Sequence, residues 1–196
     1  KHGARLMVDD AHSVGVLGNG RGTAAHFGLT DEVDLIMGTF SKSFASLGGF
    51  IAADADVIEY IQHHARALIF SASITPASTA AAMAALEVMQ EEPERIVRVN
   101  QIGERMRRDY TKLGFNVLSS QTPIVPILIG DDVPTVLAWK TLYEAGVYTN
   151  PVIPPGVPPE LSLLRTSYMA THTDEQLDRV VATFADLAQM MGLEGS

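Results

Sequence analysis

The chain has 196 residues, and 46% of them are hydrophobic, which is enough to bury a sizeable core in one large domain or two small ones. The net charge of −9 with only 14 lysines and arginines excludes a basic stripe for nucleic acid, and the absence of cysteine excludes disulfides and thiolate chemistry. No apolar run approaches the roughly 18–20 residues of a transmembrane segment, so we expect a cytoplasmic protein.

Two short apolar runs open the chain, and each ends in polar residues. ARLMVDD (4–10) ends in two carboxylates, and VDLIMGTF (33–40) ends in glycine and threonine. Both runs are typical of buried strands in a parallel sheet. The glycine-rich connection between them has room for at most one short helix, and GGFIAAD (48–54) suits a third strand.

Helical patterns follow. Residues 54–69 place apolar side chains at helical spacing, which predicts one helix with a buried face and with His63 and His64 on the solvated side. Residues 77–90 are rich in alanine, with Pro76 suited to the first turn, and predict a closely packed helix. Residues 91–114 predict a long charged helix that ends at Gly114.

The pattern changes near Glu94, where short strands begin to alternate with helices. We expect strands at 115–119 and 122–130, a helix at 133–146, a proline-stiffened loop at 150–160 and a last helix opened by a capping box of Thr173 and Gln176. Two domains are therefore predicted. Residues 1–93 belong to a large parallel-sheet domain, and residues 94–196 form a small α+β domain.

Polar residues gather where the first two strands end. Asp9, His12, Thr39 and Lys42 lie at these ends, and ligands of open α/β sheets bind at the carboxyl ends of strands. Taken singly, each side chain suits a strand cap, a loop or an exposed turn. Their combination points to one cleft.

Several other motifs are excluded by spacing. GTFSKS lacks the glycine that a phosphate-binding P-loop needs directly before the lysine, because Ser41 stands there. GNGRG lacks the spacing of the dinucleotide fingerprint, and no GxSxG elbow of a serine hydrolase occurs. No second histidine stands at a ligand spacing from His12 on its predicted element, so no metal site is expected.

A lysine among small residues remains as the candidate nucleophile. Small neighbours let a planar cofactor approach an amine, and a lysine amine forms Schiff bases. Pyridoxal phosphate needs a carboxylate beside its ring nitrogen and hydroxyl donors around its phosphate. Asp9 suits the first role, and Thr39 and Ser71 suit the second.

VDDAHSVGVLGNGRG, GTFSKSFASLGGF, FSASITP and LLRTSYMATHT together resemble, in order and spacing, the α-oxoamine synthases. These are pyridoxal-phosphate enzymes of fold type I, with the aspartate-aminotransferase fold. Most members condense an amino acid with an acyl-CoA and release CoA and carbon dioxide. Members are about twice as long as this chain, so the resemblance implies a C-terminal half, which is expected to bind cofactor poorly by itself.

The resemblance also implies roles for individual residues. Lys42 would form the Schiff base with the cofactor and carry the proton at the substrate α-carbon. Asp9 would pair with the ring nitrogen, His12 would lie by the phenolic oxygen, and Thr39 would bind the phosphate. Two further roles follow from the family: Phe70 and Ser71 would reach the phosphate site of the neighbouring subunit of a homodimer, and Arg165 would hold the substrate carboxylate.

GTFSKS and NPVIPPGVPP most resemble the bacterial serine palmitoyltransferases of this family, which implies L-serine and a long-chain acyl-CoA as substrates in sphingolipid synthesis. Peripheral membrane contact is left open, because a long-chain product partitions into lipid. The alternatives are another α-oxoamine synthase, such as an 8-amino-7-oxononanoate synthase or a 2-amino-3-ketobutyrate CoA ligase, a fold-related aminotransferase, and a catalytically silent partner subunit. Many aminotransferases carry a phosphate-binding arginine where this chain has Phe50, and silent partners tend to lose the lysine.

Overall fold

The computed structural model describes residues 2–193 and divides the chain into two compact units, residues 1–97 and 98–196. The division falls inside helix α5 (Glu94–Lys112), between Val97 and Arg98. The predicted boundary between 93 and 94 lies four residues earlier, at the start of this helix.

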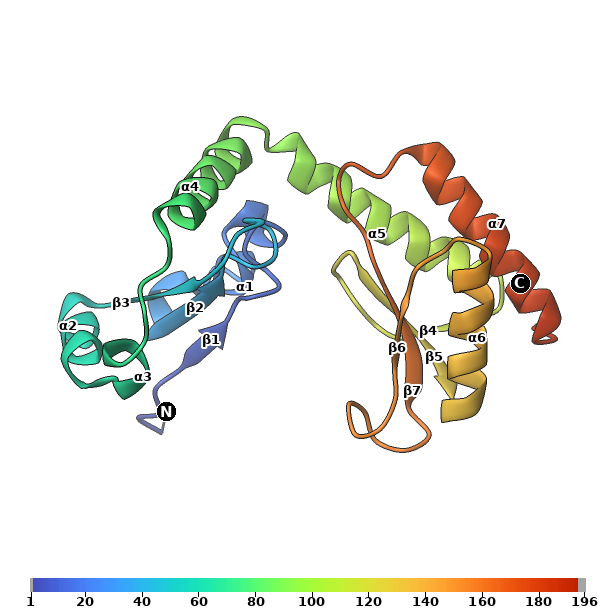
Figure 1. Cartoon of the computed structure of the whole chain (residues 1–196), viewed down its shortest axis with the longest axis horizontal. Helices are drawn as coiled ribbons and strands as arrows, with labels where there is room; N and C mark the ends of the chain where they lie inside the picture. The colour runs from blue at the N-terminus through green and yellow to red at the C-terminus, as the bar shows by residue number, and fades with distance from the viewer. Residues whose placement is uncertain (1, 194–196) are drawn as a thin grey trace. The chain divides into compact units, whose positions relative to one another are not determined.

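The first unit contains a three-stranded sheet with the order β1-β2-β3 (Figure 1). β1 (Met7–Asp9) runs parallel to β2 (Leu35–Thr39), as predicted, whereas β3 (Gly49–Ala53) returns antiparallel to β2. The β1–β2 connection contains helix α1 (Thr23–His26) and the 3-10 turns η1 (Gly18–Gly20) and η2 (Thr30–Glu32). The sheet is therefore mixed: β1 and β2 are parallel, and β2 and β3 are antiparallel.

The helices of the first unit bury less than the sequence predicts. The prediction of a single helix over 54–69 is wrong. Ala65 adopts an extended backbone and separates α2 (Ala55–His64) from α3 (Arg66–Ile69). α4 (Pro76–Glu91) begins as predicted, with Thr75 as its N-cap. Within the described chain α2 buries no residue and α4 buries only Ala82, so the expected buried face and close packing are not observed.

The second unit is an antiparallel sheet of order β4-β5-β7-β6 with three helices. Its strands are β4 (Asn116–Val117), β5 (Ile124–Gly130), β6 (Asn150–Val152) and β7 (Ser162–Ser167), and its further helices are α6 (Asp132–Glu144) and α7 (Asp174–Met190). β6, which the sequence predicted as loop, is an edge strand, and an edge tolerates the missing amide of Pro151.

Apolar side chains from all three helices and the sheet meet in one core. Met106 of α5, Leu142 of α6, Phe184 of α7 and Leu164 of β7 are all fully buried. Side chains alternate along a strand, so Leu164 points to the helices while Arg165 lies on the opposite face of the sheet. Among the described residues, no helix has the length and apolarity needed to cross a membrane.

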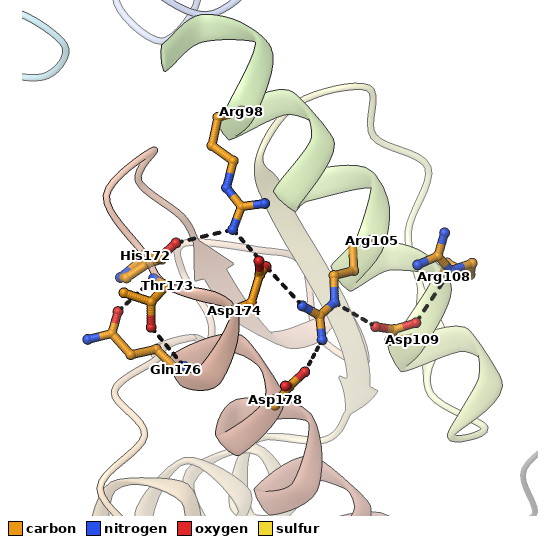
Figure 2. Close-up of polar contacts among 9 residues, drawn as sticks. All are labelled: Arg98, Arg105, Arg108, Asp109, His172, Thr173, Asp174, Gln176 and Asp178. Carbon is orange, nitrogen blue, oxygen red and sulfur yellow. Dashed lines mark hydrogen bonds and ion pairs between the residues drawn. The ribbon is translucent and has the colours of Figure 1, made fainter. Parts of the chain in front are cut away.

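Ion pairs join α5 to the start of α7 (Figure 2). Arg98 donates to Asp174 at 2.7 Å, and Arg105 contacts both Asp174 and Asp178. The hydrogen bond from Arg98, followed by the charge of that guanidinium, lowers the pKa of the Asp174 carboxyl. The predicted capping box is present, because Thr173 and Gln176 bond reciprocally with each other's backbone amides.

Candidate active site

The ends of β1 and β2 place two of the predicted residues on one face of the sheet. Asp9 is paired in register with Met37, and Thr39 follows two residues later along β2. Because side chains alternate between faces, Asp9, Met37 and Thr39 share one face. The Asp9 carboxylate is exposed and accepts the Ala11 amide at 2.9 Å. The Asp9 carboxylate and the Thr39 hydroxyl therefore lie on the same face, at the end of the β1–β2 pair.

Lys42 lies on the turn that leaves β2, in a tightly bonded backbone. The Lys42 carbonyl accepts the Ala45 amide at 2.9 Å, and the Ser46 amide donates to Phe40 at 2.7 Å. Ala45 has a positive φ of 48°, a conformation that is costly for a residue with a side chain and that clusters at functional sites. The buried Phe44 anchors the turn, while the lysine side chain is exposed.

Two hydroxyl groups that follow the lysine tie this turn to its neighbours. Ser43 donates to the carbonyl of Val14 at 2.8 Å, and Ser46 donates to the carbonyl of Ser78 at 2.6 Å. Val14 follows His12 by two residues, so the bond from Ser43 joins the lysine turn directly to the segment that carries the histidine. Asp9, His12, Thr39 and Lys42 therefore lie on adjoining segments of the first unit, and their roles in one site stay a prediction.

His12 is an exposed residue in the turn after β1, and this turn depends on a residue that the sequence reading did not select. Asp10 is fully buried, and its carboxylate accepts hydrogen bonds from the Ser13 hydroxyl and the Thr23 amide. The signal that could have found it is strand alternation, because adjacent carboxylates at the end of a strand point to opposite faces. Asp9 and Asp10 therefore have different surroundings.

Phe50, at the position where many aminotransferases carry an arginine, is a packing residue. It pairs in register with Gly38, and a Cβ atom on Gly38 would lie 2.4 Å from the Phe50 ring. The Phe50 ring also lies 5.7 Å from that of Phe40, measured between centroids. Phe50 and Gly38 occupy the face of the sheet opposite to Asp9 and Thr39, so position 50 cannot supply a polar group beside them.

Phe70 and Ser71 follow the short helix α3. The Phe70 side chain is 79% exposed, and the Ser71 hydroxyl donates to the carbonyl of Ala67. The exposed ring projects away from the fold of its own unit. Their predicted contact with the phosphate site of a second subunit stays a prediction.

Arg165 belongs to the second unit, in the middle of β7, where it pairs in register with Pro126 and Asn150. It lines a cavity of about 470 Å³ together with Tyr110 and Tyr168, whose hydroxyls are 2.5 Å apart. The Arg165 side chain is half-buried in the wall of this cavity.

The two tyrosines of this cavity are neutral donors. Burial raises the pKa of Tyr168 to about 12, and burial also raises the pKa of Tyr110 well above its ordinary value. Both phenols therefore keep their protons at physiological pH, and Arg165 and Arg179 supply positive charge to the cavity wall.

The sequence family Aminotransferase class I and II matches residues 1–184 of this chain. A serine palmitoyltransferase from Sphingobacterium spiritivorum is 53% identical over 182 residues, which are 92% of this chain and 46% of that protein. A putative 8-amino-7-oxononanoate synthase 2 from Mycobacterium tuberculosis is 45% identical over 197 residues, which cover 100% of this chain and 26% of that protein.

Solved structures give the same result for the fold. A serine palmitoyltransferase from S. paucimobilis with a bound PLP-myriocin aldimine matches with a TM-score of 0.92 and 31% identity, over 97% of this chain and 49% of that one. The fold class predicted from the sequence, PLP fold type I, is therefore confirmed. The chain spans about half the length of the serine palmitoyltransferases it matches.

Proposed function

Because this chain belongs to the aminotransferase class I and II family, we propose that it is part of a PLP-dependent α-oxoamine synthase of the serine palmitoyltransferase type. The proposed reaction joins L-serine to a long-chain acyl-CoA. The bond between the serine α-carbon and its carboxylate breaks, a bond from that α-carbon to the acyl carbon forms, and the thioester bond breaks. The products are an aminoketone, CoA and carbon dioxide.

The observation that carries the proposal is the set of groups at one end of the β1–β2 pair. A carboxylate (Asp9) and a hydroxyl (Thr39) share one face of the sheet, and an exposed amine (Lys42) lies on the turn that follows. This donor set suits PLP, which has a basic ring nitrogen, an aldehyde and a phosphate. When bound, PLP supplies stabilisation of negative charge at the amino-acid α-carbon.

Each side chain has a defined task in this proposal. The Asp9 carboxylate holds a proton on the ring nitrogen by charge and hydrogen bonding. The Thr39 hydroxyl, which donates to the Gly48 carbonyl at 3.1 Å, would turn its hydrogen to the phosphate. The Lys42 amine would hold the cofactor and then move a proton at the substrate α-carbon, and the His12 imidazole would donate a hydrogen bond near the phenolic oxygen. Arg165 binds the substrate carboxylate by paired hydrogen bonds.

A fold-related aminotransferase is the second candidate, and Phe50 argues against it. An aminotransferase of the common type would use a basic side chain at this position for the phosphate, and here an aromatic ring packs against Gly38 instead. A catalytically silent subunit is disfavoured because Lys42, Asp9 and His12 are all retained. The assembly we propose is a homodimer in which Phe70 and Ser71 reach the phosphate site of the neighbouring subunit.

The test uses the complete protein, reconstituted with PLP. Visible absorbance is followed while serine, glycine and alanine are added in turn, and thiol release is then measured with acyl-CoAs of different chain length. Serine with long acyl chains alone should give thiol release. Release with glycine or alanine but not with serine would instead assign the chain to another α-oxoamine synthase.

Lys42→Ala is the diagnostic variant, with Lys112→Ala as its control because Lys112 is an exposed lysine in the last turn of α5. Loss of the amine should remove the absorbance of the bound cofactor and lower the rate by about 10²–10⁴, the usual contribution of a positioned acid or base. Lys112→Ala should match the wild type. Unchanged absorbance in Lys42→Ala would refute the assignment of the cofactor to this lysine.

A further inference from the structure

Asp10 is a buried carboxylate that the proposed reaction does not use. Its exposed fraction is 0%, and burial of a charged group is costly unless donors surround it. The Ser13 hydroxyl donates to Oδ1 at 2.5 Å, and the Thr23 amide donates to both oxygens, at 3.0 and 3.1 Å. Thr23 in turn donates its hydroxyl to Ser13 at 2.9 Å. The carboxylate is therefore the centre of a small network between the end of β1 and the start of α1.

The backbone of Asp10 closes the turn that contains His12. The Asp10 carbonyl accepts the amides of Ser13 at 3.0 Å and Val14 at 3.1 Å, and the Asp10 amide donates to Met37 of β2 at 2.8 Å. His12 lies between these anchor points. Main chain and side chain of one residue thus connect the histidine turn to β2 on one side and to α1 on the other.

The space around the Asp10 carboxylate is closed. Gly22 has a φ of +97°, and a Cβ atom at this position would lie 2.2 Å from Asp10 Oδ2. Only glycine combines this backbone with this contact. The segment that ends in Gly22 therefore packs directly on the carboxylate, and a side chain at position 10 with a different shape or charge would displace the turn.

We propose that Asp10 is a positioning residue for His12: its buried carboxylate, bonded to Ser13 and Thr23, holds the turn that sets where the imidazole stands. The proposal rests on the proposed function, in which His12 acts beside the reacting atoms. A displacement of about 1 Å in a catalytic group can cost roughly 10² in rate, so a loosened turn should slow the reaction while substrate binding changes little.

The variants are made in the complete protein. Asp10→Asn keeps the shape but places an NH₂ group against the Thr23 amide, and Asp10→Ala removes both side-chain acceptors while the backbone carbonyl remains. Ser13→Ala removes one donor and leaves the carboxylate in place. Asp31→Asn is the control, because it makes the same chemical change at an exposed aspartate of the same unit.

Hydrogen exchange of the unliganded protein tests the turn itself. The Thr23 amide should exchange about tenfold faster in Asp10→Ala, and by a smaller factor in Asp10→Asn, because it loses its carboxylate acceptor. The amides of Ser13 and Val14 keep the carbonyl of residue 10 as their acceptor, so they should exchange faster by a smaller factor, as the turn loosens. Asp31→Asn should leave these rates unchanged. Equal protection of the three amides in Asp10→Ala and wild type would overturn the proposal.

Kinetics test whether Asp10 acts through His12. Asp10→Asn should lower kcat for thiol release by about 10- to 100-fold, with KM for acyl-CoA and the absorbance of the bound cofactor unchanged. In a His12→Asn background the same substitution should change kcat by less than about twofold, because the group that it positions is already absent. An equal loss in both backgrounds would indicate a general structural role and would overturn the proposal.

The two assays separate this inference from the proposed function. A wild-type protein that releases no thiol with any acyl-CoA contradicts the proposed function, and the exchange measurement still decides whether Asp10 holds the turn. A wild-type protein that reacts while Asp10→Asn reacts equally fast contradicts the inference alone. If Asp10→Ala does not fold, Asp10→Asn and Ser13→Ala decide the question by the same measurements.

Discussion

The two units differ in how much apolar side chain they bury and in whether they bury a charged group. In residues 98–196 a continuous apolar core excludes Met106, Leu164 and Phe184 fully from solvent. Within residues 98–193, the polar residues buried with it carry hydroxyls and no charge: Thr135, Thr149, Ser162 and Thr166. In residues 1–97 the buried apolar side chains among those described are Ala24, Phe44 and Ala82. The first unit buries the carboxylate of Asp10, together with Ser13, next to the turns of the candidate site.

The large apolar core thus lies in the second unit, whereas Asp9, His12, Thr39 and Lys42 of the candidate site lie in the first. Burial of apolar surface is the main source of folding free energy, so the second unit has the means to stabilise itself. The first unit exposes large apolar side chains, among them Phe27, Tyr60 and Phe70, and uses hydrogen bonds to shape the turns that hold Lys42 and His12. We expect it to need further protein surface over these apolar groups.

The largest expected effect is on independent folding. Expressed separately, residues 94–196 should unfold cooperatively in a urea titration followed by circular dichroism, because they contain helix α5 and the whole apolar core. Residues 1–93 should show no cooperative transition, because they bury too little apolar surface. A sigmoidal transition in residues 1–93 would contradict the comparison.

The next effect concerns the core of the second unit. Leu164→Ala should lower the free energy of unfolding of residues 94–196 by about 2–5 kcal/mol, because Leu164 is fully buried and the truncation leaves a cavity. Leu137→Ala is the matched control, because Leu137 is 59% exposed and should cost no more than about 0.5 kcal/mol. Similar urea midpoints for the two variants would show that this core is not the source of stability.

A smaller effect is expected at Gly22 of the first unit, which packs against the buried Asp10 carboxylate. In the complete protein, Gly22→Ala should cost at least about 1 kcal/mol, because the new Cβ meets the Asp10 carboxylate and the backbone disfavours a side chain. Gly28 also has a positive φ, but its Cβ position is open, so Gly28→Ala reports backbone strain alone. Urea midpoints and exchange of the Thr23 amide measure the difference, and equal values would exclude the contact with Asp10 as its cause.

The smallest effect is on the ion pairs of the second unit. The folded-state pKa of Asp174 lies below its ordinary value of 3.8, because Arg98 donates to it. The associated stabilisation is therefore complete above this ordinary value and disappears as the pH falls through the folded-state pKa. The urea midpoint of residues 94–196 should decrease in acid, and Asp174→Asn should reduce that decrease.

Glu175→Gln is the control for this pH effect, since Glu175 is also in the first turn of α7. It should preserve the acid sensitivity that Asp174→Asn removes. Added salt should weaken the effect of Asp174, because exposed ion pairs are screened. An identical pH profile for the wild type and Asp174→Asn would contradict a role for the pair with Arg98.

Local patterns predicted much of the fold. The long charged helix before Gly114, the capping box of Thr173 and Gln176, and the parallel pair of strands before Asp9 and Thr39 are all present. These features depend on neighbours within a few residues or on a simple alternation of elements. The break at Ala65 and the strand at 150–152 were missed, because the first depends on one backbone conformation and the second on pairing with a distant strand.

The sequence by itself determined which groups the candidate site is predicted to contain. The spacing of a carboxylate, a histidine, a hydroxyl and a lysine at two strand ends selected Asp9, His12, Thr39 and Lys42, because backbone direction alone brings such ends to one edge. Only the tertiary structure decided which neighbouring groups hold these residues in place. Burial distinguishes Asp10 from the adjacent Asp9, and burial depends on contacts with segments that are distant along the chain.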